Sequence, residues 1–235
     1  MGLLTVGKPL KWGDSVQHID YIKKHGIEQF INLYRAQKDR RSDSFKWGDE
    51  LEYLLLWTPS KRKVAKLSLR SADIMKSAES KMDAADDPMD GVILHPEYGS
   101  FMIEATPLMP YGNTHCDLLL VERNMFRRRM VIEDELKDTE CLSTLASFPM
   151  LGVGDFVECA DLRVNGPIAA SQFIPDSLIN PHPRFGALTR NIRLRRGSPV
   201  QIHVPIFRDL NTPKTENSIF ADAMAFGMGS CCVQV

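Results

Sequence analysis

The stretch that decides the fold is Trp47-Gly48-Asp49-Glu50-Leu51-Glu52-Tyr53-Leu54-Leu55-Leu56-Trp57, which is rich in apolar and aromatic residues and is followed two residues later by a proline. These features predict a β-strand. Residues two apart on a strand share a face, so Glu50 and Glu52 lie on the same face as Leu54 and Leu56. Two neighbouring carboxylates on an apolar face resist both burial and simultaneous ionisation.

Two explanations of the paired glutamates remain open at this point. A bound divalent cation would relieve both the burial and the repulsion, because carboxylate oxygens are ligands that suit Mg²⁺ or Mn²⁺. Alternatively, the strand lies at the edge of its sheet, and Glu50 and Glu52 simply face water.

Two further glutamates lie on or near a second predicted strand, at residues 101–106. Glu104 shares a strand face with Met102, whereas Glu97 lies seven residues before Glu104 and would fall on the opposite face of one straight strand. The two can converge only if the chain bends near Gly99. Four glutamates on or near two strands would then form a polynuclear metal site, the kind that clamps phosphates during phosphoryl transfer.

The rest of the pattern mixes helices and strands. A helix capped at Asp14 or Ser15 would carry apolar residues as far as Tyr34, with Gly26 interrupting it. Further helices are expected over residues 71–85 and 114–137, strands over 200–207 and at the end near 235, and turns or a long loop over 149–183. Because the elements do not alternate as βαβ units, they favour an α+β fold with an antiparallel sheet and flanking helices.

Composition narrows the class of protein. The chain has 235 residues, with 29 Lys and Arg against 30 Asp and Glu, so its formal net charge is -1. This balance argues against a general attraction to nucleic acid or to an anionic membrane, and no apolar run is long enough to span a membrane. The five cysteines fit no zinc spacing and no export signal precedes them, which indicates reduced thiols in a cytoplasmic protein. They are Cys116, Cys141, Cys159, Cys231 and Cys232.

Two clusters of arginines have alternative interpretations. Arg127, Arg128 and Arg129 are expected on a solvated face of the helix over 114–137, whose apolar stripe begins at Leu118 and includes Ile132. A second group could contact a phosphate or a carboxylate, or could belong to a solvated loop; nucleic-acid binding would usually add interleaved aromatic residues. Its members are Arg184, Arg190, Arg193, Arg195 and Arg196.

The last ten residues combine Gly227 and Gly229 with the neighbouring cysteines Cys231 and Cys232. Glycines let a backbone approach a ligand closely, but this pattern lacks the lysine of a P-loop. The two cysteines fit either a thiol site or small buried apolar residues.

Several long motifs occur in a recognisable order. They are Met-Gly-Leu-Leu at 1–4, Phe-Lys-Trp-Gly-Asp-Glu-Leu-Glu-Tyr at 45–53, His-Pro-Glu-Tyr-Gly-Ser-Phe-Met-Ile-Glu-Ala-Thr-Pro at 95–107, Ser-Phe-Pro at 147–149, His-Pro-Arg-Phe at 182–185, Leu-Thr-Arg-Asn-Ile-Arg-Leu-Arg-Arg-Gly at 188–197 and Asp-Ala-Met-Ala-Phe-Gly-Met-Gly at 222–229. With them the sequence resembles, from Met1 to Val235, the catalytic subunit of the eukaryotic glutamate–cysteine ligase (γ-glutamylcysteine synthetase) family.

The resemblance implies a fold similar to glutamine synthetase and the guanidino kinases, with an antiparallel sheet as the floor of the active site. It implies the first step of glutathione synthesis, in which ATP phosphorylates the side-chain carboxylate of L-glutamate and the amine of L-cysteine then attacks. Mg²⁺, or Mn²⁺ in its place, would bridge the phosphates. The family's metal ligands correspond to Glu50, Glu52, Glu97, Glu104 and Gln234. Met228 and Cys232 correspond to positions that line the glutamate pocket.

Members of the family are much longer, so residues 1–235 are expected to be the N-terminal part of a single catalytic domain, cut within a sheet strand. Little or no ligase activity is expected from the chain alone. The alternative is a catalytically dead truncated ligase that acts as a subunit-interaction module, because catalytic subunits of the family pair with a modifier subunit in some lineages. A nucleic-acid binder that uses the segment from Arg190 to Arg196 is the third hypothesis, and salt-dependent association would identify it.

Overall fold

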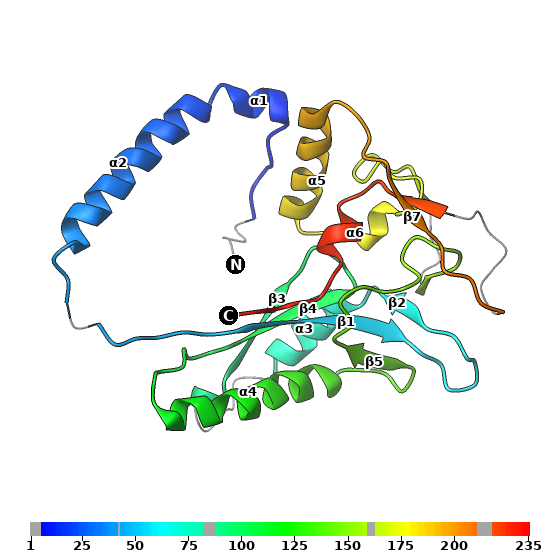
Figure 1. Ribbon diagram of the computed structural model, residues 1–235, viewed down its shortest axis with the longest axis horizontal. Coiled ribbons are helices and arrows are strands. Elements are labelled where there is room, and N and C mark those ends of the chain that lie inside the picture. Colours follow the sequence, from blue (N-terminus) through cyan, green and yellow to red (C-terminus); the bar gives the residue numbers. More distant parts are fainter. Residues whose placement is uncertain (1–5, 42, 82–87, 159–162, 211–217) are drawn as a thin grey trace.

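The computed structural model describes residues 6–41, 43–81, 88–158, 163–210 and 218–235, and it confirms an α+β fold with a mostly antiparallel sheet (Figure 1). The motif at residues 1–4, Cys159 and the expected helix end at 82–85 lie outside these ranges. In chain order the elements are α1 (Trp12–Val16), α2 (Ile19–Gln37), β1 (Glu50–Trp57), β2 (Lys66–Ser68), α3 (Ser71–Glu79), η2 (Pro88–Asp90), β3 (Val92–Pro96), β4 (Met102–Pro107), α4 (His115–Glu133), β5 (Glu140–Ser143), β6 (Val157–Glu158), η3 (Asp176–Leu178), α5 (Pro183–Arg196), β7 (Ile202–Pro205), β8 (Ser218–Ala221), α6 (Ala225–Met228) and β9 (Val233–Gln234).

Strand β1 lies inside the seven-stranded sheet and not at its edge. It pairs with β4 and then β2 along one side, and with β9 and then β5 along the other. Of the strand pairs in this sheet, β2 with β6 is parallel and the others are antiparallel. The edge-strand explanation of Glu50 and Glu52 is therefore wrong, because both sides of β1 are occupied.

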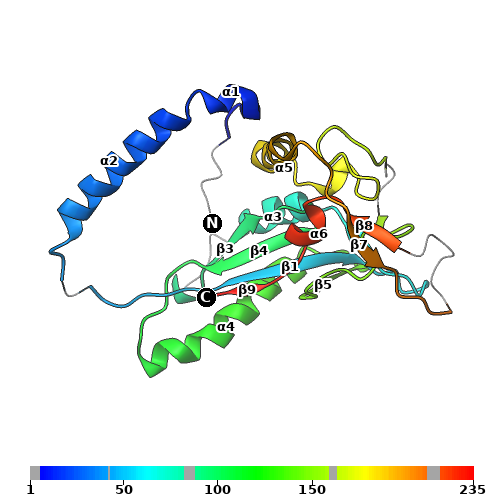
Figure 2. The same ribbon diagram turned by 45° about the horizontal axis from the view of Figure 1, so that its top comes forward.

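The two faces of the sheet bury two separate cores. Tyr53 and Leu55 pack with apolar residues of α3 and α4 on one face, whereas Leu54 and Leu56 pack with residues of the turn-rich segment 148–179, α5 and α6 on the other. Figure 2 shows α4 on one side of the sheet and α5 with α6 on the opposite side. Alternate residues of β1 therefore belong to two separate apolar cores, one on each face of the sheet.

Helix α4 buries Ile132 of the expected apolar stripe but not the residue at which that stripe begins. Its N-terminus has a capping box formed by Thr114 and Asp117. Leu118, expected in the apolar stripe, is 55% exposed, whereas the buried residues of the helix are Asn124, Arg128 and Ile132. These three are spaced four apart and so lie on one face of the helix.

Arg128 was expected on a solvated face, and this expectation is wrong, because its exposed fraction is 0%. Its Nη2 lies 2.6 Å from Asp49 Oδ2, and its Nη1 donates to the backbone oxygens of Asp49 (3.2 Å) and Ala105 (2.9 Å). The ion pair and these hydrogen bonds make burial of the guanidinium possible.

The N-terminal segment forms an arm. Asp14 and Ser15 lie inside α1 and do not cap α2, which begins at Ile19 and continues unbroken through Gly26. None of the 19 residues of α2 is buried, and both ribbon views show this helix extending away from the sheet (Figures 1 and 2). Helix α1 is held by α5, since the Trp12 backbone N–H donates to Asn191 Oδ1 at 3.0 Å.

Other expectations differ in detail. The arginine-rich segment is helix α5 and not a solvated loop, and it ends at Gly197, whose φ of 74° is a left-handed conformation that suits glycine. Strands β2, β3, β5 and β6 were not expected. The strands expected over 200–207 and near 235 are seen as β7 and β9. No helix in the described part of the chain is both long enough and apolar enough to cross a membrane.

Candidate metal centre

Pairing of β1 with β4 places two glutamates face to face. Glu52 and Glu104 are direct partners in the antiparallel register, and their exposed fractions are 7% and 2%. Directly opposite residues share a face of the sheet, and like charges in such a pair are destabilising. The pair therefore needs a compensating charge or a proton.

A third glutamate reaches this pair through the turn between β3 and β4. Gly99 lies in this turn, where its backbone oxygen accepts a hydrogen bond from Met102 N at 3.0 Å. The turn brings Glu97 back over the sheet, so that one carboxylate oxygen each from Glu52, Glu97 and Glu104 lies within 4.8 Å of the other two. The bend near Gly99 that convergence required is thus present.

Two of the three carboxylates accept hydrogen bonds from nearby N–H groups. Glu52 accepts from the backbone N–H of Cys232 at 2.9 Å and from Gln234 Nε2 at 3.2 Å. Glu97 accepts from the backbone N–H of Tyr98 at 3.0 Å. These contacts orient oxygens toward one another although all three residues are acidic.

Glu104 is the least compensated of the three. Its Oε1 is buried and has no hydrogen-bond partner within the described residues. The pKa of Glu104 is raised to about 8, first by burial, then by its side-chain hydrogen bond with Glu97, and further by the charges of Glu50 and Glu97. Burial is also the largest cause of the raised pKa of Glu52. A buried oxygen without a donor, within reach of two other carboxylates, fits a divalent cation such as Mg²⁺.

Glu50 and Gln234 lie beside this group. They are direct partners in the pairing of β1 with β9, and both line a pocket of about 440 Å³. Glu50 is outside the set of three converging oxygens, but its charge raises the pKa of Glu104. Because Gln234 Nε2 donates to Glu52, its amide Oε1 is the atom that could ligate a cation.

The two residues expected at a glutamate pocket lie in different surroundings. Cys232 is exposed, donates its backbone N–H to Glu52, and has a thiol whose pKa is raised mainly by desolvation. Met228 lies on α6 and lines a separate pocket together with residues of α5. Cys232 therefore contacts Glu52 directly, whereas Met228 lines a pocket that none of the three glutamates lines.

Sequence reasoning missed the support beneath the centre. The buried pair of Arg128 and Asp49 anchors α4 to β1 immediately before Glu50, and Arg128 also holds the backbone of β4 next to Glu104. The spacing of four from Ile132 could have indicated that Arg128 faces the sheet. The run of three arginines alone could not show that Asp49 is the acidic partner of Arg128.

Comparison with known proteins agrees with the motifs. The family described as glutamate-cysteine ligase matches residues 2–235. The chain is 43% identical over 253 residues to the human glutamate–cysteine ligase catalytic subunit, 38% identical over 264 residues to the glutamate–cysteine ligase of Dictyostelium discoideum, and 34% identical over 316 residues to that of Schizosaccharomyces pombe. Each match covers all of this chain but 40%, 41% and 47% of the respective relative. The chain thus spans less than half the length of these relatives.

Proposed function

Because the chain belongs to the glutamate–cysteine ligase family, we propose that it supplies the metal-binding half of a centre that joins L-glutamate to L-cysteine at the expense of ATP. The observation that carries the proposal is the convergence of Glu52, Glu97 and Glu104 on one face of the sheet. Residues 1–235 would then be the N-terminal part of a single catalytic domain, since the relatives are more than twice as long.

The chemistry explains why such a centre needs carboxylates. Transfer of the terminal phosphoryl group of ATP to the side-chain carboxylate of glutamate gives an acyl phosphate and releases ADP. The amine of cysteine then attacks the acyl carbon, forms the amide bond and releases inorganic phosphate. Bound Mg²⁺, or Mn²⁺, would neutralise the phosphate oxygens in this reaction. The contribution of the protein is to hold the ion and the reactants in place. Glu52, Glu97 and Glu104 would hold the ion, with Glu50 and Gln234 beside them.

The assignment of the substrate pocket rests on the family resemblance. Cys232, next to Glu52, would line the glutamate pocket close to the metal, and Met228 would line it from α6. The mostly antiparallel sheet that carries the three glutamates is compatible with the fold of glutamine synthetase and the guanidino kinases, in which the sheet forms the floor of the site. The free cysteines among the described residues are in keeping with a reducing, cytoplasmic location.

Binding of Mn²⁺ to the chain tests the proposal without requiring turnover. Isothermal titration of wild-type chain, Glu52→Gln and Glu104→Gln should give an affinity at least about tenfold weaker in both variants. Glu122→Gln, which changes an exposed glutamate of α4, is the matched control and should bind as the wild type does. Equal affinity in all four proteins would refute the metal assignment.

A coupled assay for ADP release with glutamate, cysteine and Mg²⁺ tests the second part of the proposal. Little or no turnover is expected from the 235 residues alone, because the longer relatives contain further sequence. Turnover at an ordinary ligase rate would refute the assignment of the chain as only the N-terminal part of the centre.

A second candidate function is a subunit-interaction module, possible even without catalysis. The observation that favours it is the exposed apolar surface of α2, which includes Tyr21, Ile22, Ile27 and Phe30. The name of the human relative, a catalytic subunit, points to a modifier subunit as partner. If α2 is the contact, the chain should co-purify with that subunit, and Phe30→Ser should abolish this whereas the control Asn32→Ser should not. Equal retention in both variants would exclude α2 as the contact.

A further inference from the structure

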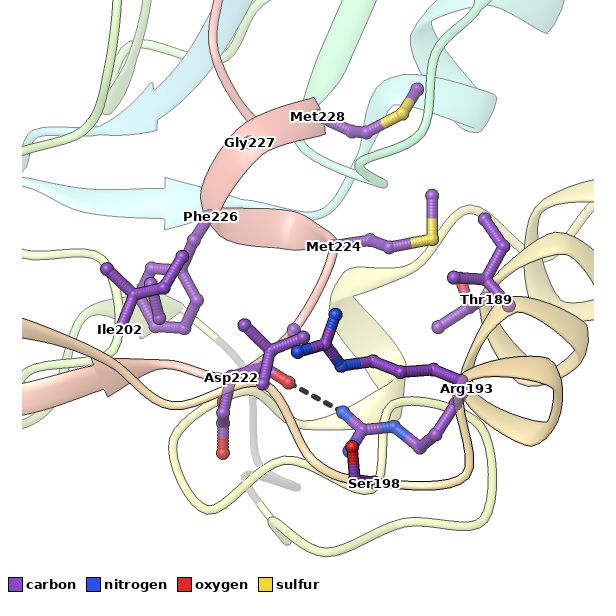
Figure 3. Close-up of a pocket in the computed structure, with 14 residues that line it drawn as sticks. Thr189, Arg193, Ser198, Ile202, Asp222, Met224, Phe226, Gly227 and Met228 are labelled. Carbon is purple, nitrogen blue, oxygen red and sulfur yellow. Dashed lines mark hydrogen bonds between the residues drawn. The ribbon is translucent and has the colours of Figure 1, made fainter.

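A second pocket, of about 460 Å³, lies between α5, the segment that follows it, and α6 (Figure 3). Its volume falls within the range of roughly 300–1,000 Å³ that is typical of small-molecule sites. Apolar side chains form most of its wall, among them Ile192, Ile202, Met224, Phe226 and Met228. None of the three converging glutamates lines it.

Two arginines give this apolar pocket a positive side. Arg193 and Arg196 are three residues apart on α5, and therefore lie on the same face of the helix, and both line the pocket. Arg193 Nη2 donates to the backbone oxygen of Asp222 at 2.6 Å, which fixes its position (Figure 3). Arg196 has no hydrogen-bond or ion-pair partner in the part of the chain that the structure describes.

The acidic residue of the lining does not compensate this charge in full. Asp222 is buried, and its carboxylate accepts hydrogen bonds from the Ser171 hydroxyl and from the Gln172 backbone N–H at 2.7 Å. Those donors belong to the loop outside the pocket lining. The lining thus contains two guanidinium groups and one carboxylate, which already accepts hydrogen bonds from outside the pocket. A net positive charge remains beside the apolar wall.

We propose that this pocket binds a small amphiphile that carries a carboxylate on a short apolar chain. The carboxylate would pair with Arg196, and with the free N–H groups of Arg193, since guanidinium groups bind carboxylates through two parallel hydrogen bonds. The apolar chain would lie against Met224, Phe226 and Met228, where flexible methionines adapt to its shape. Met228 is also assigned to the glutamate pocket under the proposed function, so the test below includes L-glutamate as a competing ligand.

Methyl NMR of the chain labelled at methionine with ¹³C tests the proposal, with octanoate as the probe and octanol as its uncharged counterpart. The signals of Met224 and Met228, assigned through Met224→Leu and Met228→Leu, should shift saturably with octanoate and require about tenfold more octanol. Arg196→Ala should weaken octanoate binding about tenfold and leave octanol binding unchanged. The control Arg190→Ala, on an exposed position of the same helix, should bind octanoate as the wild type does.

Results of three kinds would overturn the proposal. One is an absence of shifts at Met224 and Met228 with octanoate. The second is equal affinity for octanoate and octanol, or equal effects of Arg196→Ala and Arg190→Ala, because either would remove the role of the charge. The third is a shift of Met224 by L-glutamate at lower concentration than octanoate, which would assign the pocket to a polar amino acid.

Discussion

Replacement of Arg128 by methionine tests the support beneath the glutamates. Methionine nearly fills the space of the arginine stem, so the cavity is small and the main loss is electrostatic. The variant leaves the Asp49 carboxylate buried without its cation and removes the hydrogen bonds that Arg128 donates to the backbone oxygens of Asp49 and Ala105. Breaking a fully buried ion pair by removal of one partner costs about 3–5 kcal/mol.

Urea unfolding of the metal-free chain measures this cost. At roughly 2–4 °C per kcal/mol for a chain of this size, the same loss should lower the melting temperature by about 6–20 °C. Arg127→Met is the matched control, because Arg127 is exposed on the same helix, and it should change the free energy of unfolding by less than about 0.5 kcal/mol.

The double variant Asp49→Leu with Arg128→Met separates the stranded charge from the lost hydrogen bonds. Both the single and the double variant lose the donors to the backbone oxygens, but only the single variant buries an unpaired carboxylate. The double variant should therefore be more stable than Arg128→Met by about 1–3 kcal/mol. A loss below about 1 kcal/mol in the single variant, or a double variant less stable than the single, would refute this reasoning.

Three further changes test other parts of the molecule. Without metal, the free energy of unfolding should fall as the pH rises from about 5 to about 8. The reason is that Glu104 releases its proton near its ordinary pKa of 4.5 in the unfolded chain but retains it to about 8 in the folded chain. The urea midpoint should lose this dependence on pH in Glu104→Gln, and an unchanged dependence would contradict the assignment. Gly26→Ala, at an exposed interior position of α2 with open space around it, should favour that helix by about 0.5–1 kcal/mol, seen as increased ellipticity at 222 nm and contradicted by a decrease. Asp222→Ala removes the acceptor of hydrogen bonds from the Ser171 hydroxyl and the Gln172 backbone N–H. The free energy of unfolding should fall by about 1–3 kcal/mol for each donor left without an acceptor. A loss below about 1 kcal/mol in thermal or urea unfolding would show that water replaces the carboxylate.

Local patterning predicted β1 well because its two faces contact different cores. The period of two put Glu50 and Glu52 on one face, and the conflict of charge with apolar neighbours left two explanations, a cation site or an edge strand. The same reasoning failed on α4, where Arg128 resembled a solvated residue. A charged side chain becomes a core residue only through its partner, and Asp49 is 79 positions away.

The position of Glu104 depended on long-range pairing. Its place opposite Glu52 follows from the register of β1 with β4, and a slip of one residue would turn either side chain to the other face. Glu97 depended in addition on the turn around Gly99. The sequence could therefore supply the candidate glutamates and the condition for their convergence, but not the register that brings them together.

Within the ranges that the structure describes, the distribution of charge across the sheet leaves the three carboxylates without a buried basic partner on their own face. Among the described residues, Arg128 is the one buried basic side chain. It contacts Asp49 and Ala105, whose positions alternate with those of Glu52 and Glu104, so Arg128 lies on the opposite face of the sheet. The fold thus places its buried guanidinium where it fixes the strands and cannot neutralise the glutamates. Local rules for a sheet interior are broken on that one face, as is expected where function and not stability selects the residues.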